Sequence, residues 1–180
     1  MEKDVLISIK GMQEYGGVEP DVIELVTRGR LVHSGKRWTL TYQESELTGL
    51  EDTQTTIQME GQQVTLLRVG SYNTQMVFEE ARRHLSMYNT PYGTVTVGVN
   101  TRRLIADLNE QGGDIEVDYS IDVDHTVAGR NIFHIKVKDM APQLWSEEVQ
   151  PADADMDQPS RPERPVAYRA EQTDFRFFQP

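Results

Sequence analysis

Strict alternation of apolar and polar side chains over residues 115–123 is the feature that most constrains the fold of this chain. Apolar residues alternate there with acidic and serine side chains, and the same period of two returns over residues 133–137. A period of two places successive side chains on opposite faces of a strand. We therefore predict two paired antiparallel strands, each with one apolar and one polar face.

The apolar residues are odd-numbered in both segments, and this restricts the turn between them. If apolar residues are to face the same side on both strands, the residue numbers of each cross-strand pair must add up to an even number. The loop between the strands must then contain an odd number of residues. Residues 127–129 fit as a three-residue loop that ends in a left-handed glycine. This register predicts that Asp122 pairs with His134 and Asp118 with Lys138, a structural explanation of the acidic residues that competes with a cation site.

The same period recurs through residues 1–138, where turn residues interrupt it at short intervals. Short strands in such a series are typical of an antiparallel sandwich or barrel rather than of βαβ units. Closure into an up-and-down barrel would remove the unpaired strand edges that invite aggregation. We predict an all-β fold, an antiparallel up-and-down β-barrel of about eight to ten strands.

Glycine and proline divide the chain after Lys138. All 13 glycines precede this residue, six of the eight prolines follow it, and residues 139–180 carry 9 acidic against 4 basic side chains. Such a segment buries too little apolar surface to offset the entropy cost of ordering, so we expect a disordered acidic tail. Its aromatic residues dock on a protein partner, fold back on the barrel or have no role, and they are Trp145, Phe175, Phe177 and Phe178.

Charge and composition exclude several classes of protein. The formal net charge is -11 and the pI is about 4.8, so we expect binding neither to nucleic acid nor to an anionic membrane. The absence of cysteine excludes a disulfide scaffold, a thiol nucleophile and a Cys-bound metal. The sequence has no apolar run near the ~18 residues that span a bilayer and opens without a signal-peptide pattern, so we expect a cytoplasmic protein.

Three charged residues follow an apolar run at the same spacing of two residues, so they should face the interior as the apolar residues do. They are Glu44, Arg68 and Arg103. Charged groups are seldom buried unless they are paired. One explanation is a Glu44–Arg68 ion pair that caps the core. The other is that Arg68 or Arg103 receives a ligand carboxylate in an apolar pocket, with a wall formed by Trp38, Tyr42, Met76, Phe78 and Met87 and with Tyr88 at the barrel end.

The two explanations predict different behaviour of an Arg68→Met variant. If Arg68 only pairs with Glu44, the substitution lowers stability and leaves any ligand bound. If Arg68 receives a ligand, the substitution abolishes ligand retention with little loss of stability.

Three hypotheses about function follow. The first is a non-enzymatic barrel that binds a small amphipathic or anionic ligand in or at its lumen, which a void of ~300 Å³ or more would support. The second is a filled barrel that acts through its surface and tail. The third is an enzyme in which Glu44 works with His84 or His125 as acid and base, although no nucleophile, phosphate-loop or dinucleotide motif is present. We expect no cofactor, and no metal because the histidines form no metal-binding pair.

An ordered set of fragments resembles the YwiB-like family of bacterial proteins, a domain of unknown function typical of Gram-positive bacteria. The fragments are LISIKG at 6–11, YQESE at 42–46, RVG at 68–70, MVFE at 76–79, YNTPYG at 88–93, DY at 118–119 and GRN at 129–131. The resemblance covers about residues 4–138. It implies a calycin-like barrel, related in shape to lipocalins and fatty-acid-binding proteins, and implies no established activity or catalytic residue.

Overall fold

The computed structural model describes residues 1–14, 19–71, 73–90 and 93–140, with the backbone alone for residues 88–90. The predicted tail falls outside the described residues from residue 141 onward, and so do its aromatic residues Trp145, Phe175, Phe177 and Phe178. The predicted boundary after Lys138 lies at the end of the last strand, which extends to Asp139.

Within the described residues the chain forms ten strands and one short 3-10 helix. In chain order they are β1 (Glu2–Glu14), β2 (Asp21–Ser34), β3 (Arg37–Gln43), η1 (Glu46–Thr48), β4 (Thr53–Glu60), β5 (Gln63–Gly70), β6 (Thr74–Glu79), β7 (Arg83–Thr90), β8 (Gly93–Asn109), β9 (Gly112–Val123) and β10 (Thr126–Asp139).

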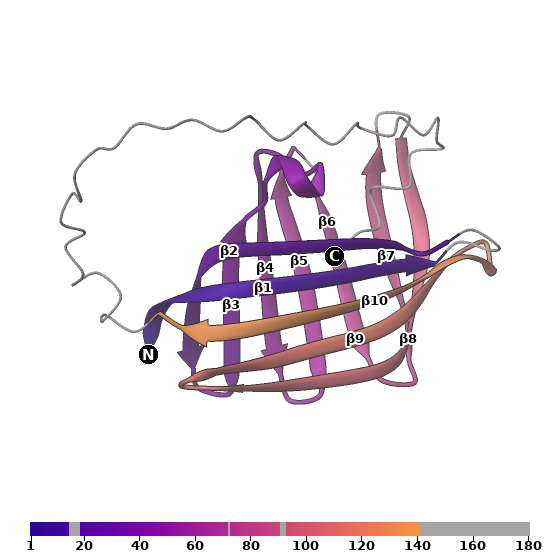
Figure 1. Ribbon diagram of the computed structural model, residues 1–180. Coiled ribbons are helices and arrows are strands. Elements are labelled where there is room, and N and C mark those ends of the chain that lie inside the picture. Colours follow the sequence, from indigo (N-terminus) through magenta and orange to yellow (C-terminus); the bar gives the residue numbers. More distant parts are fainter. Residues whose placement is uncertain (15–18, 72, 91–92, 141–180) are drawn as a thin grey trace, which may run out of the picture. The chain divides into compact units, whose positions relative to one another are not determined.

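The strands form one closed barrel (Figure 1). Each strand pairs antiparallel with the next along the chain, and β10 pairs with β1 to close the sheet. This is the order of an up-and-down barrel, so the predicted fold class is confirmed. Closure pairs the edges that an open sheet would expose.

The up-and-down order gathers alternate strand ends at the two ends of the barrel. One end carries η1, which connects β3 to β4 and lies at the top of Figure 1, and we call it the η1 end. The turns from β2 to β3, from β4 to β5 and from β6 to β7 lie at the opposite end.

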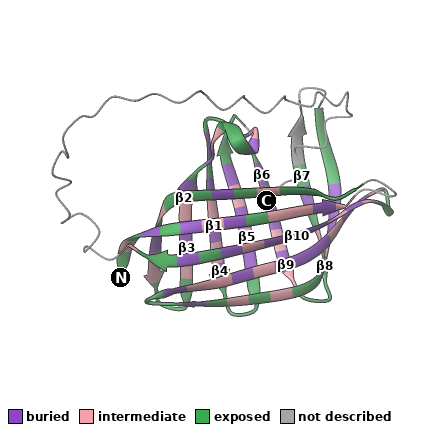
Figure 2. Cartoon of the chain, viewed as in Figure 1, coloured by how far each residue is buried: buried purple, intermediate pink, exposed green. Residues whose placement is uncertain are grey.

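Buried and more exposed residues alternate along the strands (Figure 2), and the buried ones form the core inside the barrel. In β1, for example, Ile7 is fully buried and its neighbour Leu6 is 37% exposed. At the centre the ring of Phe78 lies 4.9 Å from that of Tyr119 and 5.6 Å from that of Phe133, centroid to centroid. Tilted and edge-on aromatic contacts of this kind stabilise a core beyond the area they bury.

The turn between β9 and β10 differs from the prediction. It consists of Asp124 and His125, which both have the positive φ (50° and 64°) that a two-residue type I′ turn requires. A bulge between Val127 and Gly129 then adds one extra residue. With this residue, the odd-numbered apolar residues of both strands face the same side. The parity argument holds, but the predicted loop at residues 127–129 is wrong.

The partners of the acidic residues on β9 differ accordingly. Asp122 lies opposite Val127 and Asp118 lies opposite Ile132. The predicted cross-strand pairs with His134 and Lys138 are therefore wrong. Arg130 of the adjacent strand β10 binds Asp118 instead, and Arg83 of β7, which lies beyond β8, binds Asp122.

A second bulge lies in β8 between Thr101 and Arg103. The extra residue, Arg102, reverses the parity of the strand, so that even-numbered residues such as Leu108 face the interior beyond it. The Arg103 side chain is 61% exposed and lies on the outer surface, 3.9 Å from Glu116. The prediction that Arg103 faces the lumen is therefore wrong.

The inward face of β7 is also opposite to the one predicted. Ser86 lies opposite the buried Val97 of β8 and is itself buried. Leu85 and Met87 consequently face outward, and each is 67% exposed. The placement of Met87 in an interior wall is wrong.

Candidate functional site

A row of inward-facing polar side chains crosses four neighbouring strands near the η1 end. Tyr42 of β3 pairs with Thr55 of β4, which pairs with Arg68 of β5, which pairs with Thr74 of β6. All four residues are buried. No bulge interrupts the pairing in these described segments, so the period-two argument correctly placed Tyr42 and Arg68 inside.

Glu44, which follows β3, directs its carboxylate into the same row. Thr55 donates a hydrogen bond to Glu44 Oε1 at 2.5 Å, and Thr48 of η1 donates one to Oε2 at 2.9 Å. The Glu44 side chain is fully buried. The short helix η1 therefore lies against this end of the barrel. It ends at Gly49, which adopts a left-handed φ of 68°.

The predicted Glu44–Arg68 ion pair is present but long. Arg68 Nε lies 3.8 Å from Glu44 Oε1, beyond hydrogen-bond distance, and both side chains have no exposed surface. Among the described residues, Arg68 Nε, Nη1 and Nη2 have no hydrogen-bond partner. A guanidinium carries five N–H donors, and burying such groups without acceptors costs several kcal/mol. Arg68 therefore presents a positive charge and unpaired donors inside the barrel.

Tyr42 completes the surroundings of Glu44. Burial raises the pKa of Tyr42 above its ordinary value, and the negative charge of Glu44 raises it further. Its hydroxyl is therefore neutral at physiological pH.

A second row of buried polar side chains lies across β8, β9, β10 and β1. Thr101 pairs with Tyr119, Tyr119 with Asn131, and Asn131 with Gln13. Thr101 Oγ1, both amide atoms of Asn131 and Nε2 of Gln13 lack hydrogen-bond partners within the described part of the chain. The sequence reasoning missed these residues. They could have been found as polar residues at positions where the alternation predicts an inward-facing side chain.

Of the residues predicted to form an apolar wall, Tyr42, Met76 and Phe78 belong to the core. Met76 and Phe78 have no exposed surface. Trp38 is half-buried at the end opposite η1, where its ring stacks on that of His33 at 4.0 Å. Tyr88 pairs with Thr74 across β6 and β7, and its side chain lies outside the described residues.

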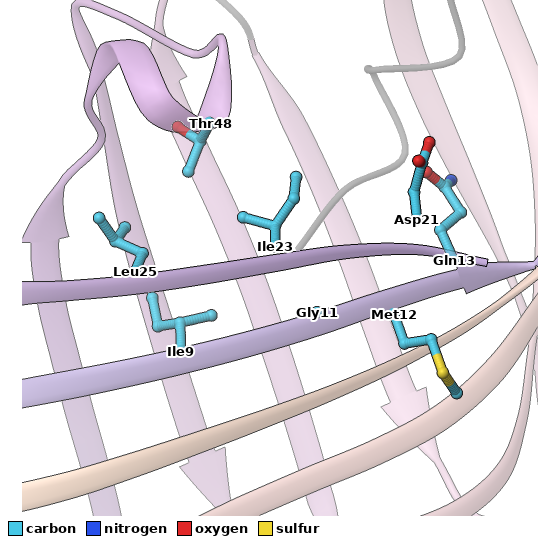
Figure 3. A pocket seen from close by; sticks show the side chains of 8 residues that line it. All are labelled: Ile9, Gly11, Met12, Gln13, Asp21, Ile23, Leu25 and Thr48. Carbon is cyan, nitrogen blue, oxygen red and sulfur yellow. The ribbon is translucent and has the colours of Figure 1, made fainter. Parts of the chain in front are cut away.

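A pocket lined by described residues lies at each end of the barrel. The first lies between β1, β2 and η1 and encloses about 420 Å³ including space open to solvent (Figure 3). Its cavity volume without the open space is about 20 Å³. The second has a cavity volume of about 200 Å³ and lies at the opposite end near Gly61, Glu80 and Leu104. Neither described pocket is lined by the predicted aromatic wall.

The structure shows no contact between Glu44 and either histidine of the enzyme hypothesis among the interactions of the described residues. His84 Nε2 lies 3.2 Å from Glu79 Oε2, and His125 belongs to the turn between β9 and β10. Glu44 contacts Thr48, Thr55 and Arg68 as described above. Over the described residues, no cluster of three or more His, Asp or Glu side chains could hold a metal ion, and no helix is long and apolar enough to cross a membrane.

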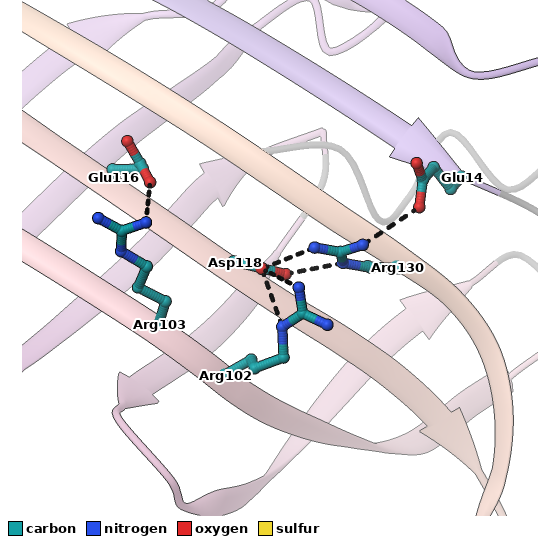
Figure 4. A network of polar contacts seen from close by, with 6 residues as sticks. All are labelled: Glu14, Arg102, Arg103, Glu116, Asp118 and Arg130. Carbon is teal, nitrogen blue, oxygen red and sulfur yellow. Dashed lines mark hydrogen bonds and ion pairs between the residues drawn. The ribbon is translucent and has the colours of Figure 1, made fainter.

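The outer face of β8–β10 holds carboxylates of a different kind. Asp118 accepts hydrogen bonds from Arg130 at 2.8 and 3.0 Å and from Arg102 at 3.1 Å (Figure 4). Asp122 is bound by two nitrogens of Arg83, at 2.7 and 2.9 Å. The hydrogen bonds from Arg130 and Arg83 hold the pKa values of Asp118 and Asp122, respectively, below the ordinary aspartate value.

Comparisons with known proteins agree with this architecture. A family model described as "Domain of unknown function (DUF1934)" matches residues 7–135. The fold is similar to the crystal structure of the ywiB protein from Bacillus subtilis, with a TM-score of 0.69 and 21% sequence identity over 78% of this chain and 94% of that chain. At this identity the likeness concerns the fold alone. No curated protein matches the chain.

Proposed function

Because the chain belongs to the family described as a domain of unknown function (DUF1934), its role must be argued from its own site, and we propose that it binds a small anion at Arg68. The predicted resemblance to the YwiB-like family is confirmed by the family match and by the solved structure. Binding is non-enzymatic in this proposal, and the cytoplasmic location remains a prediction.

The unpaired guanidinium of Arg68 carries the proposal. Its three nitrogens lack hydrogen-bond acceptors among the described residues, and its nearest carboxylate stands 3.8 Å away. A carboxylate or a similar oxyanion matches the forked donors of arginine and forms short, charge-assisted hydrogen bonds with them. An external anion therefore supplies acceptors for the donors that Glu44 leaves unpaired.

Packing restricts the size of this anion. The aromatic cluster of Phe78, Tyr119 and Phe133 fills the centre of the barrel, and these three residues are fully buried. The two pockets described above lie at the ends of the barrel, away from the predicted aromatic wall. We therefore favour an anion with a small head group held near the η1 end over a long lipid threaded through the lumen.

The test is titration of the full chain with acetate, followed by NMR or calorimetry. Arg68→Lys keeps the positive charge but loses the planar fork, so we expect acetate to bind at least about ten-fold more weakly. Arg68→Met should abolish binding. Arg37→Lys is the matched control, since Arg37 is exposed and pairs with Glu60 on the surface. The proposal fails if acetate binds both Arg68 variants as it binds the unaltered protein.

A second candidate function, a filled barrel acting through its surface, is favoured by the outward apolar residues of β7. Leu85 and Met87 are each 67% exposed on neighbouring outward positions of one strand. Exposed apolar groups on one face are a common feature of interaction sites. Sedimentation of the full chain and of a Leu85→Ser/Met87→Ser variant tests the idea. Self-association that the variant loses would support it, and a monomer in both cases would contradict association through this face.

A further inference from the structure

We infer that the pocket between β1, β2 and η1 is the second half of the Arg68 site and takes the uncharged part of the ligand. This inference rests on the proposed function and specifies the ligand class, a small carboxylate whose short apolar chain carries a hydrogen-bond acceptor. We call this pocket the η1 pocket; its lining is Ile9, Gly11, Met12, Gln13, Asp21, Ile23, Leu25 and Thr48.

The walls of the η1 pocket form a mostly apolar surface that opens to solvent. Ile9, Ile23 and Leu25 present aliphatic side chains toward the space beneath η1 (Figure 3). Gly11 occupies the inward position between Ile9 and Gln13 on β1, and its missing side chain leaves room there. Each methylene buried on such a surface contributes about 0.8 kcal/mol.

Gln13 adds one specific polar group to this wall. Its side chain is more than nine-tenths buried, and its amide nitrogen Nε2 has no hydrogen-bond acceptor within the described residues. A buried donor without an acceptor costs stability, and a ligand carbonyl in the pocket would supply that acceptor. Asp21, at the same end of the pocket, repels a second negative charge. The group recognised here is therefore an uncharged acceptor.

Thr48 connects the η1 pocket to the charged site. It lines the pocket, and its hydroxyl donates to Oε2 of Glu44 at 2.9 Å. The other oxygen of that carboxylate lies 3.8 Å from Arg68 Nε. Glu44 thus contacts both a residue of the pocket wall, Thr48, and the Arg68 guanidinium.

Three probe carboxylates test the inference by titration of the full chain: acetate, pentanoate and 4-oxopentanoate. Pentanoate adds an apolar chain to acetate, and 4-oxopentanoate adds a carbonyl acceptor to that chain. We expect pentanoate to bind about ten-fold or more tightly than acetate, because methylenes enter the η1 pocket. We expect 4-oxopentanoate to bind at least as tightly as pentanoate, because Gln13 receives its carbonyl.

Two variants locate the effect. Ile23→Trp fills the η1 pocket, so pentanoate should lose its advantage in affinity over acetate. Gln13→Met removes the amide donor at similar volume, so 4-oxopentanoate should become at least about five-fold weaker than pentanoate. The melting temperature of Gln13→Met should not fall, because the substitution removes a buried unpaired group.

The outcomes separate this inference from the proposed function. The η1 pocket is not a subsite if acetate and pentanoate bind with equal affinity, or if Ile23→Trp leaves pentanoate binding unchanged. In either case the proposed function still holds if acetate binding depends on Arg68. Acetate binding that is unchanged in both Arg68 variants overturns both.

Discussion

Two arginine–carboxylate pairs of the same barrel have opposite hydrogen-bonding states. On the outer face, Arg83 binds Asp122 through two nitrogens at 2.7 and 2.9 Å. Inside, Arg68 approaches Glu44 only to 3.8 Å, and its donors have no acceptor among the described residues. The outer pair is complete without a ligand, whereas the inner pair leaves its donors available to one.

The difference shows how to separate structural from functional charge in this protein. The outer pair is so closely built that a Cβ on Gly98 would lie 2.3 Å from Asp122 Oδ2 and 2.4 Å from Arg83 Nη2. The glycine in β8 is thus explained by the approach of two side chains. The inner pair is surrounded by hydroxyl groups that satisfy only Glu44. Stability alone accounts for the outer arrangement, and it does not account for the inner one.

The largest expected effect comes from removing the inner carboxylate. Glu44→Ala leaves the Arg68 charge buried without compensation, so the free energy of unfolding should fall by about 3–5 kcal/mol. Urea denaturation measures it. Glu60→Ala is the control, since it breaks an exposed pair with Arg37 and should cost about 1 kcal/mol or less. Equal costs for the two variants would contradict the buried charge pair.

The next effect concerns the outer pair. Gly98→Ala should lower the free energy of unfolding by about 2 kcal/mol, because the added methyl group displaces the Arg83–Asp122 contact. In an Arg83→Ala background the same substitution should cost less, since part of the clash is gone. A double-mutant cycle checks this, and additive costs would refute it. Acetate binding should be unchanged in Gly98→Ala.

Acid should weaken the outer face. Hydrogen bonds from arginine hold the pKa values of Asp122 and Asp118 below their value in the unfolded chain, so folding favours their ionised forms. Their contribution is fully present above about pH 4 and is lost as the pH falls through the lowered values. Urea denaturation of Asp122→Asn between pH 5 and pH 2 should show a shallower loss of stability than the unaltered protein. An identical pH dependence would contradict this role.

Much of the fold follows from the sequence because period-two alternation reports the faces of a strand directly. It correctly predicted an up-and-down barrel and the burial of Glu44 and Arg68, because β3 and β5 run without a bulge through these described positions. It failed at Arg103, because one extra residue in β8 reverses the parity and carries no marker in the sequence. A bulge also displaced the expected turn between β9 and β10.

The second polar row could have been found from the same alternation. Gln13 continues the inward parity of Ile7 and Ile9, and Asn131 precedes Phe133 on the inward parity of β10. The sequence reasoning considered only charged residues at inward positions, so it missed the amide side chains of Gln13 and Asn131. The hydrogen-bond distances that distinguish the inner from the outer pair depend on side-chain geometry, which the alternation of residues does not encode.

The smallest expected effect follows from the corrected position of Arg103. Its side chain is largely exposed and only 3.9 Å from Glu116, so Arg103→Ala should change the free energy of unfolding by no more than about 0.5 kcal/mol. Acetate affinity should also stay the same. Thermal denaturation and the acetate titration check both points, and a loss of acetate binding would return Arg103 to the site.

The most direct test of the account is the Nε–H resonance of Arg68 in proton–nitrogen NMR spectra during titration with acetate. We predict a saturable shift of this resonance with the same dissociation constant that the bulk titration gives, while the Nε–H of Arg83, already bonded to Asp122, stays in place. A resonance of Arg68 that does not move while acetate binds elsewhere would contradict the claim that its guanidinium receives the anion.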